Sequence, residues 1–187
     1  MPNWVENSVT IKSSEEDISQ IIIQLSVEQP SKDTESKISF MNIVSPPEDY
    51  MNTYNEGSNW YMWNVAHWGT KWDACEPHYF SSGSTSVTYG FQTAWSPPIP
   101  VFQKLSEQYP NATITLEWEE EQGFGGEEEF LGGTHTMLSS WDIPSSHSDY
   151  EARDKDCPCN WSDEPDDWFE DCPTNEERVI CQCGSCG

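Results

Sequence analysis

The spacing of apolar and polar residues changes three times over the first 41 positions. Residues 4–11 carry β-branched and aromatic side chains in partial alternation, which predicts a strand. Isoleucine and leucine then recur at helical spacing, and this pattern predicts an amphipathic helix over residues 15–27. A proline and a polar run follow the helix, and the short apolar run at residues 38–41 predicts a second strand.

The central part of the chain repeats this order after a long aromatic stretch. Residues 50–80 are dense in Trp and Tyr without a clear period, so we expect a loop whose last residues enter a strand. Alternation then predicts strands at residues 85–95 and 112–119, separated by a helix at 99–109 that begins with proline in its first turn. An acidic, glycine-rich strip occupies residues 119–133.

The predicted order is β-α-β, an aromatic loop, and β-α-β, which indicates an α+β fold. Two such units make a ferredoxin-like split βαβ plait, a sheet with two helices on one face. The apolar periodicity stops near residue 138. We therefore expect a ferredoxin-like domain at residues 1–138, a linker at 139–156, and an irregular, acidic, Cys-rich tail at 157–187.

The charge of the chain excludes several functions. The net charge is −25, with 33 acidic against 8 basic residues, and it divides into −8 over residues 1–116 and −17 over 117–187. Phosphate binding needs clustered Lys and Arg, so direct nucleic-acid binding is not expected. No apolar run reaches the length of a membrane span. The start of the chain lacks a basic segment followed by an apolar one, so we expect a cytoplasmic protein.

Four short motifs in fixed order carry a family resemblance. They are Met-Pro-Asn-Trp at 1–4, Trp-Gly-Thr-Lys-Trp-Asp-Ala at 68–74, Phe-Gln-Thr-Ala-Trp-Ser-Pro-Pro at 91–98, and Glu-Gln-Gly-Phe-Gly-Gly at 121–126. Over residues 1 to about 135 the chain resembles the YubB-type ferredoxin-like family of phages and plasmids, which has no settled activity. The resemblance implies a mobile-element origin and the same plait. It transfers no catalytic residues, and the Cys-rich tail lies outside it.

Six of the seven cysteines fall in the last 31 residues. In a cytoplasmic protein such a cluster favours a metal site over disulfides, and an iron–sulfur cluster is a more distant alternative. Zinc takes four thiolate or imidazole ligands in a tetrahedron, and its binding energy would order a tail without an apolar core. We predict a structural zinc held by Cys157, Cys159, Cys183 and Cys186, with Cys172 and Cys181 as alternates. The four scattered histidines are interpreted as ordinary surface or packed residues.

The tryptophan-rich stretches offer a candidate pocket. Trp68, Trp72 and Trp95, with Lys71 and Asp73 beside them, could line a ligand site. Packing is the favoured interpretation, because the chain is poor in Leu and Val and tryptophan then fills the core. If residues 71–73 form a strand, alternation places Lys71 and Asp73 on the face opposite Trp72.

No catalytic motif is present, so a non-enzymatic protein is expected: there is no nucleophile elbow, phosphate-binding loop or zinc-protease helix.

The acids of residues 117–129 and 163–177, with Trp161 and Trp168 as anchors, suggest a surface that occupies a basic groove. The hypothesis is a phage or plasmid protein that inhibits a host protein with a basic surface, as a partial nucleic-acid mimic. Alternatives are a small-molecule or nucleotide-binding module and a structural accessory protein. The proposed partner-binding residues are Glu119, Glu120, Glu121, Glu127, Glu128, Glu129, Trp161, Asp166, Asp167 and Trp168.

Overall fold

A computed structural model describes residues 2–26, 38–48, 50, 60–157 and 171–172 of the chain. It divides into two compact units, Met1–Asp142 and Ile143–Gly187. The elements of the first unit are β1 (Trp4–Lys12), α1 (Glu15–Leu25), the 3-10 turn η1 (Phe40–Asn42), α2 (Trp60–Trp68), β2 (Cys75–Gly83), β3 (Ser86–Ala94), α3 (Ile99–Gln108), β4 (Thr113–Glu120), β5 (Gly125–Leu131) and β6 (Thr134–Trp141). The second unit contains α4 (His147–Ala152).

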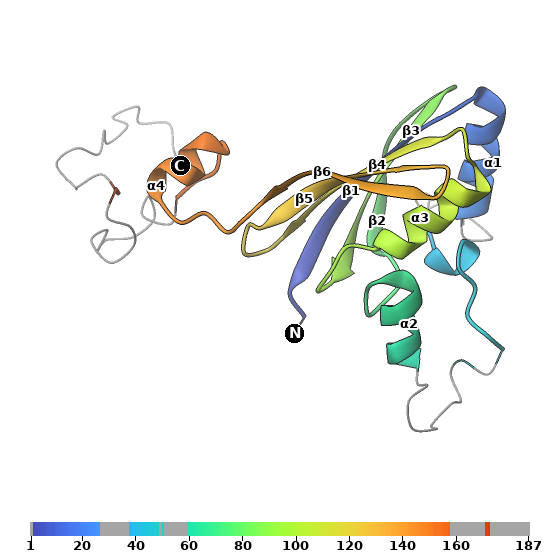
Figure 1. Cartoon of the computed structure of the whole chain (residues 1–187), viewed down its shortest axis with the longest axis horizontal. Coiled ribbons are helices and arrows are strands. Elements are labelled where there is room, and N and C mark those ends of the chain that lie inside the picture. Colours follow the sequence, from blue (N-terminus) through green and yellow to red (C-terminus); the bar gives the residue numbers. More distant parts are fainter. Residues whose placement is uncertain (1, 27–37, 49, 51–59, 158–170, 173–187) are drawn as a thin grey trace, which may run out of the picture. The chain divides into compact units, whose positions relative to one another are not determined.

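The strands of the first unit form one antiparallel sheet in the order β2-β3-β1-β4-β5-β6 (Figure 1). Strand β1 lies at the centre, paired with β3 on one side and β4 on the other. With α1 before β2 and α3 between β3 and β4, this order is the ferredoxin-like plait. The predicted α+β fold class is therefore confirmed, and the hairpin of β5 and β6 extends the plait by two strands.

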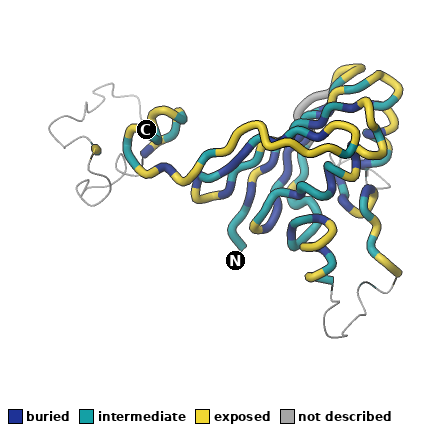
Figure 2. Tube along the Cα trace, in the orientation of Figure 1, coloured by how far each residue is buried: buried dark blue, intermediate teal, exposed yellow. Residues whose placement is uncertain are grey.

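The core lies between one face of the sheet and the helices α1 and α3. Helix α1 buries Ile18, Ile21 and Leu25, and α3 buries Val101, Phe102 and Leu105, all at 2% exposure or less. In β1 and over most of β4, buried positions alternate with intermediate or exposed ones (Figure 2). Since strand side chains point alternately to the two faces, the covered face is mainly apolar and the other is mainly polar.

The predicted strand at residues 38–41 is wrong. Ile38 makes only an isolated bridge to Ser26, and Phe40 begins the turn η1. The cause is Asp73, whose carboxylate accepts hydrogen bonds from the Phe40 amide at 2.7 Å and the Ser39 hydroxyl at 2.6 Å. These bonds satisfy polar groups that a strand would give to a sheet. The second strand of the plait is β2.

Two further elements occupy stretches that the sequence left irregular. Helix α2 lies within the aromatic stretch of residues 50–80, where large side chains on every side hide the helical period. The acidic strip at 119–133 contains β5, which turns into β6 through Gly132 and Gly133, both at positive φ. Strand β6 is mostly exposed and polar, so it shows no alternation.

Helix α4 lies within residues 139–156, the stretch expected to be a linker. Its N-terminus is capped by Ser146, whose hydroxyl accepts a hydrogen bond from the Asp149 amide at 3.1 Å. Among the described residues, no helix is long and apolar enough to cross a membrane.

Candidate functional site

The face of the sheet that faces away from α1 and α3, hereafter the open face, carries glutamates from three neighbouring strands. On β1, Val5 and Asn7 are buried while Glu6 between them is exposed, so Glu6 points to the open face. The same alternation and the strand register place Glu117 and Glu119 of β4 and Glu127 of β5 beside it. One end of the open face is therefore acidic.

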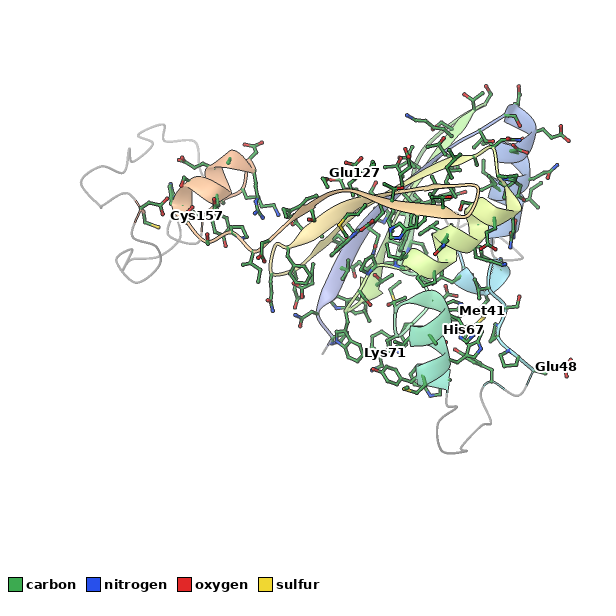
Figure 3. The ribbon with its side chains drawn as sticks, in the orientation of Figure 1. Met41, Glu48, His67, Lys71, Glu127 and Cys157 are labelled. Carbon is green, nitrogen blue, oxygen red and sulfur yellow. The ribbon has the colours of Figure 1, made fainter. Side chains whose placement is uncertain are left out.

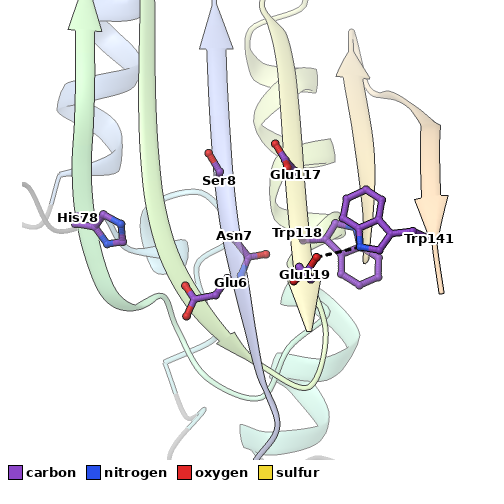
Figure 4. Close-up of a pocket in the computed structure, with 8 residues that line it drawn as sticks. All are labelled: Glu6, Asn7, Ser8, His78, Glu117, Trp118, Glu119 and Trp141. Atoms are coloured by element: carbon purple, nitrogen blue, oxygen red, sulfur yellow. Dashed lines mark hydrogen bonds between the residues drawn. The ribbon is translucent and has the colours of Figure 1, made fainter. Parts of the chain in front are cut away.

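A hollow of about 250 Å³ lies at this end of the open face (Figure 4). In that view the helices lie behind the strands, and Glu6, Glu117, Glu119 and Trp141 stand around the hollow. Its lining residues are Glu6, Asn7, Ser8, His78, Glu117, Trp118, Glu119 and Trp141. The hollow thus combines carboxylates with one imidazole and an aromatic wall, which suits a cationic group better than an anionic one.

Trp141 forms the aromatic wall because β5 has a glycine opposite it. A Cβ atom on Gly125 would lie 2.7 Å from the Trp141 ring and 2.3 Å from the Trp118 carbonyl oxygen. The absence of a side chain lets the indole lie flat against the strand, where its Nε1 donates a hydrogen bond to Glu119 Oε2 at 3.2 Å. The indole position is therefore set by Gly125 and Glu119 together.

The register brings like charges directly opposite each other. Glu6 is paired with Glu119 across β1 and β4, and Glu117 with Glu127 across β4 and β5. Like charges in this position destabilise a sheet by a fraction of a kcal/mol, on the order of 0.2–1 per pair. The Glu6 and Glu119 carboxylates accept hydrogen bonds from Gln92 Nε2 and Trp141 Nε1, but the pairing of like charges itself does not stabilise the sheet.

Two of the predicted partner-binding acids lie on the other face. Glu120 and Glu128 are each 2% exposed. Glu128 accepts hydrogen bonds from Trp118 Nε1 at 3.3 Å and lies 2.7 Å from His135 Nε2. Glu120 accepts a hydrogen bond from the Gln122 amide at 2.7 Å. These carboxylates hold the β4–β5 hairpin and do not present charge to a partner.

Of the remaining predicted acids, Glu119, Glu127 and Glu129 point to the open face, and Glu121 is exposed in the turn after β4. Four predicted partner contacts lie outside the described residues: Trp161, Asp166, Asp167 and Trp168. Glu6 and Trp141 had not been predicted. What brings Glu6 and Trp141 to the site is the register between the strands, and the register cannot be read from the sequence alone.

The five residues of the predicted tryptophan pocket separate into packing and surface roles. Trp68 is 1% exposed and belongs to the core, where its Nε1 donates to the Val44 carbonyl at 3.0 Å. Asp73 holds η1, and residues 71–73 form a bend rather than a strand, so the expected alternation does not apply. Trp72 and Trp95 remain at the surface around Lys71.

Lys71 lies between two indole rings. Its Nζ is 4.5 Å from the centroid of Trp72 and 4.8 Å from that of Trp95, within the range of cation–π attraction (Lys71 is labelled in Figure 3). Trp95 is 45% exposed and has a φ of +74°, a backbone conformation that is strained for a bulky side chain. Strained exposed residues of this kind concentrate at functional sites, so this is a second candidate surface.

The second unit brings together one histidine and two cysteines (Cys157 is labelled in Figure 3). Single ligand atoms of His147, Cys157 and Cys172 all lie within 4.8 Å of one another, and the two Sγ atoms are 3.9 Å apart. This is a group that could bind a metal ion. It contains Cys157 of the predicted set and the alternate Cys172, together with His147, which sequence analysis had interpreted as an ordinary histidine. The other predicted ligands, Cys159, Cys181, Cys183 and Cys186, lie outside the described residues.

The cysteine of the first unit has a different environment. Burial raises the pKa of the Cys75 thiol, and the neighbouring charges of Asp73 and Glu76 raise it further. A thiol with a raised pKa stays protonated at neutral pH and is a poor nucleophile and a poor metal ligand. Cys75 therefore serves as a control thiol for experiments on the second unit.

Comparison with known proteins supports the fold. Residues 67–157 match the family model of a ferredoxin-like domain in Api92-like protein. The structure is similar to the crystal structure of a protein api92 from Yersinia pseudotuberculosis, with a TM-score of 0.59 and 8% sequence identity, over 77% of this chain and 99% of that chain. None of the curated proteins matches the sequence. The predicted ferredoxin-like fold is thus confirmed, the likeness to the YubB-type family stays a prediction, and neither description names a reaction or a ligand.

Proposed function

We propose that this protein binds a basic protein surface through the acidic end of its open face. The observation that carries the proposal is that two glutamate pairs lie directly opposite each other in the strand register, Glu6 with Glu119 and Glu117 with Glu127, at the hollow beside Trp141. Arg or Lys side chains of a partner would remove the repulsion within each pair. An Arg guanidinium also stacks on an indole, which gives Trp141 a role as an anchor.

The long-range field supports the same kind of partner. The chain carries a net charge of −25, so it attracts basic surfaces and repels nucleic acid before any contact forms. Within the six strands the basic residues are Lys12, His78 and His135, against eight glutamates. Electrostatic attraction of this size raises the association rate and favours basic partners over neutral ones.

The more specific proposal is that the partner is a host protein with a groove built for phosphates. In that case the protein is a phage- or plasmid-encoded inhibitor that acts in the host cytoplasm as a partial nucleic-acid mimic. Its resemblance to a family of mobile elements supports this role, and so does the lack of a catalytic motif in its sequence. A binding protein that blocks a groove needs charge and shape but no reaction chemistry.

Two matched variants test the proposal. The open-face variant, Glu117→Gln with Glu119→Gln, removes one charge from each cross-strand pair. The helix variant, Glu15→Gln with Glu16→Gln, removes the same net charge from exposed positions in the first turn of α1. The full chain would be used as bait in host lysate at low and at high salt, and any captured protein would be identified by mass spectrometry and purified.

We expect a basic partner that is captured by the wild type and the helix variant, lost with the open-face variant, and weakened by salt. Binding that survives in the open-face variant, or that is indifferent to salt, would overturn the proposal. An inhibition assay on the purified partner, with and without its nucleic acid, then tests mimicry separately from binding.

A second candidate function rests on the strained, exposed Trp95 and the cation held between its ring and Trp72. Lys71 with two indole rings could hold a planar anionic ligand such as a nucleotide, since the rings stack and the ammonium pairs with phosphate. The negative charge of the chain as a whole opposes such a ligand. A rise in melting temperature with nucleotides that is lost in Trp95→Ala would favour this function.

For the second unit, we propose that the metal is zinc and that its role is structural. Zinc, of the common cellular metals, is the one typically bound by thiolate together with imidazole ligands. In this unit the residues from 143 onward that the structure describes bury only Pro144 and Cys157, so these residues show no apolar core of their own. A bound zinc would supply folding energy in place of that core.

A further inference from the structure

The two thiol sulfur atoms of the second unit have the spacing of two ligands of one tetrahedral metal ion, and an atom of His147 lies within 4.8 Å of both. With zinc–sulfur bonds of about 2.3 Å, two thiolates on a tetrahedron lie about 3.8 Å apart. The Sγ atoms of Cys157 and Cys172 are 3.9 Å apart. A disulfide needs about 2.05 Å between the same atoms. The observed distance therefore fits two ligands of one zinc ion and does not fit a disulfide.

Cys157 and His147 differ in exposure in a way that suits such a site. Cys157 is 1% exposed, whereas the His147 side chain is 12% exposed and Cys172 is partly buried. Ile143, an aliphatic residue that could have built a core here, is 44% exposed. A buried thiol beside a second thiol and an imidazole is typical of a structural metal centre.

Asp171 holds Cys172 next to His147. The Asp171 carboxylate accepts hydrogen bonds from the backbone amides of His147 at 2.6 Å and Ser148 at 2.9 Å, and from the Ser148 hydroxyl at 2.8 Å. These bonds lower the pKa of Asp171 to about 2, with the Ser148 amide as the largest cause. Because Asp171 directly precedes Cys172, they position the thiol at the start of α4, where His147 is the first residue.

A carboxylate also lies beside the imidazole. Glu151, one helical turn after His147, places Oε1 3.3 Å from His147 Nε2. Metal-bound histidines commonly interact with a carboxylate through the ring nitrogen that does not bind the metal, which fixes the ring and raises its basicity. Asp149 accepts hydrogen bonds from the amide and hydroxyl of Ser145, both at 2.9 Å, and steadies the same helix end.

We propose that His147, Cys157 and Cys172 are ligands of one tetrahedral zinc ion, with Asp171 and Glu151 as positioning residues. This inference rests on the structural zinc proposed above and replaces the all-cysteine set with a mixed one. It assigns three of the four positions of the tetrahedron. His147 is the residue that distinguishes the two sets, since the all-cysteine set does not use it.

The test uses the full chain, purified under reducing conditions and loaded with Zn²⁺ or Co²⁺. Zinc per chain is measured by elemental analysis, and affinity by competition with a chromophoric chelator. X-ray absorption at the zinc edge of the wild type counts nitrogen and sulfur neighbours without any variant. The variants are His147→Gln and Cys172→Ser, with His67→Gln and Cys75→Ser as controls from the first unit.

We expect one zinc per chain, a nitrogen in its first shell, and a loss of affinity of tenfold or more in His147→Gln and Cys172→Ser but not in the controls. A first shell of four sulfurs, with affinity unchanged in His147→Gln, would overturn the mixed site and leave a structural zinc in place. A wild-type chain that binds no zinc would overturn both. If His147→Gln does not fold, the nitrogen count of the wild type decides.

Discussion

The charge pairs of the open face make a prediction in which stability and binding change in opposite directions. The open-face variant, Glu117→Gln with Glu119→Gln, removes both like-charge contacts, Glu117 with Glu127 and Glu6 with Glu119. Glutamine keeps an oxygen that can accept the hydrogen bond from Trp141 Nε1. We therefore expect the variant to be more stable than the wild type while it binds the basic partner less well.

The magnitude follows from the strand geometry. Directly opposite residues have Cβ atoms about 5 Å apart. Two unit charges at that distance in water would repel by about 0.8 kcal/mol, and physiological salt would reduce this to about 0.4 kcal/mol. This is an upper limit for Glu6 and Glu119, whose carboxylates accept hydrogen bonds from Gln92 and Trp141 on opposite sides of the pair. Removal of two pairs should raise the free energy of unfolding by at most about 0.8 kcal/mol. In 1 M salt, where the Debye length is about 3 Å, the gain should fall to about 0.3 kcal/mol.

The assay is urea unfolding at low and high salt, with the helix variant as the control. Glu15 and Glu16 lie in the first turn of α1, where acids interact favourably with the helix dipole. Their replacement should lower stability by about 0.3–1 kcal/mol for each acid, although the net charge changes by the same amount. An open-face variant that is less stable than the wild type, or whose gain persists in 1 M salt, would refute the assignment of repulsion to these pairs.

Two further predictions concern the wall of the hollow and the second unit. Gly125→Ala should lower the free energy of unfolding by about 1–3 kcal/mol, because the added Cβ would lie 2.3 Å from the Trp118 carbonyl oxygen. Gly83→Ala is the control in the same urea assay. A Cβ at Gly83 has nothing within 4 Å, so this variant should change the free energy of unfolding little. The Asp171 carboxyl, followed by NMR, should titrate near pH 2. The pKa of Asp171 is lower in the folded than in the unfolded protein, so its contribution to stability is present above pH 3.8 and is lost as the pH falls toward 2. A carboxyl that titrates at 3.8 would contradict the hydrogen bonds from His147 and Ser148.

The plait could be predicted where one face of an element is buried and the other is not. In β1 and β4 the buried and exposed positions alternate over most of their length, and α1 places three buried residues on one helical face. In such elements, apolar residues recur in the sequence with the period of the strand or the helix, because the buried face selects them. Strand β6 has no buried residue, so neither period appears and the strand was missed.

Helix α2 and the turn η1 could not be predicted from the sequence for a different reason. The sequence of α2 has apolar side chains on nearly every side, and η1 depends on a carboxylate that lies 33 residues away. The candidate site has the same limit, because the opposition of Glu6 and Glu119 depends on a register between strands that are far apart in sequence. His147 was interpreted as ordinary for this reason too: Asp171, which brings Cys172 beside it, is 24 residues further on.

The distribution of charge on the open face argues that its acids do more than keep the protein in solution. The glutamate pairs and the hollow lie at the end of the sheet where β1 begins. Toward the other end of β1 the same face carries mainly threonines, and Thr10 pairs with Thr88 at 3.1 Å and lies opposite Thr115, with Glu129 of β5 as the one glutamate of these strands beside them. Solubility needs only that charges be exposed, and charges spaced apart would serve it without repulsion. Charges gathered at one end at a cost to stability fit a surface whose opposite charges belong to another protein.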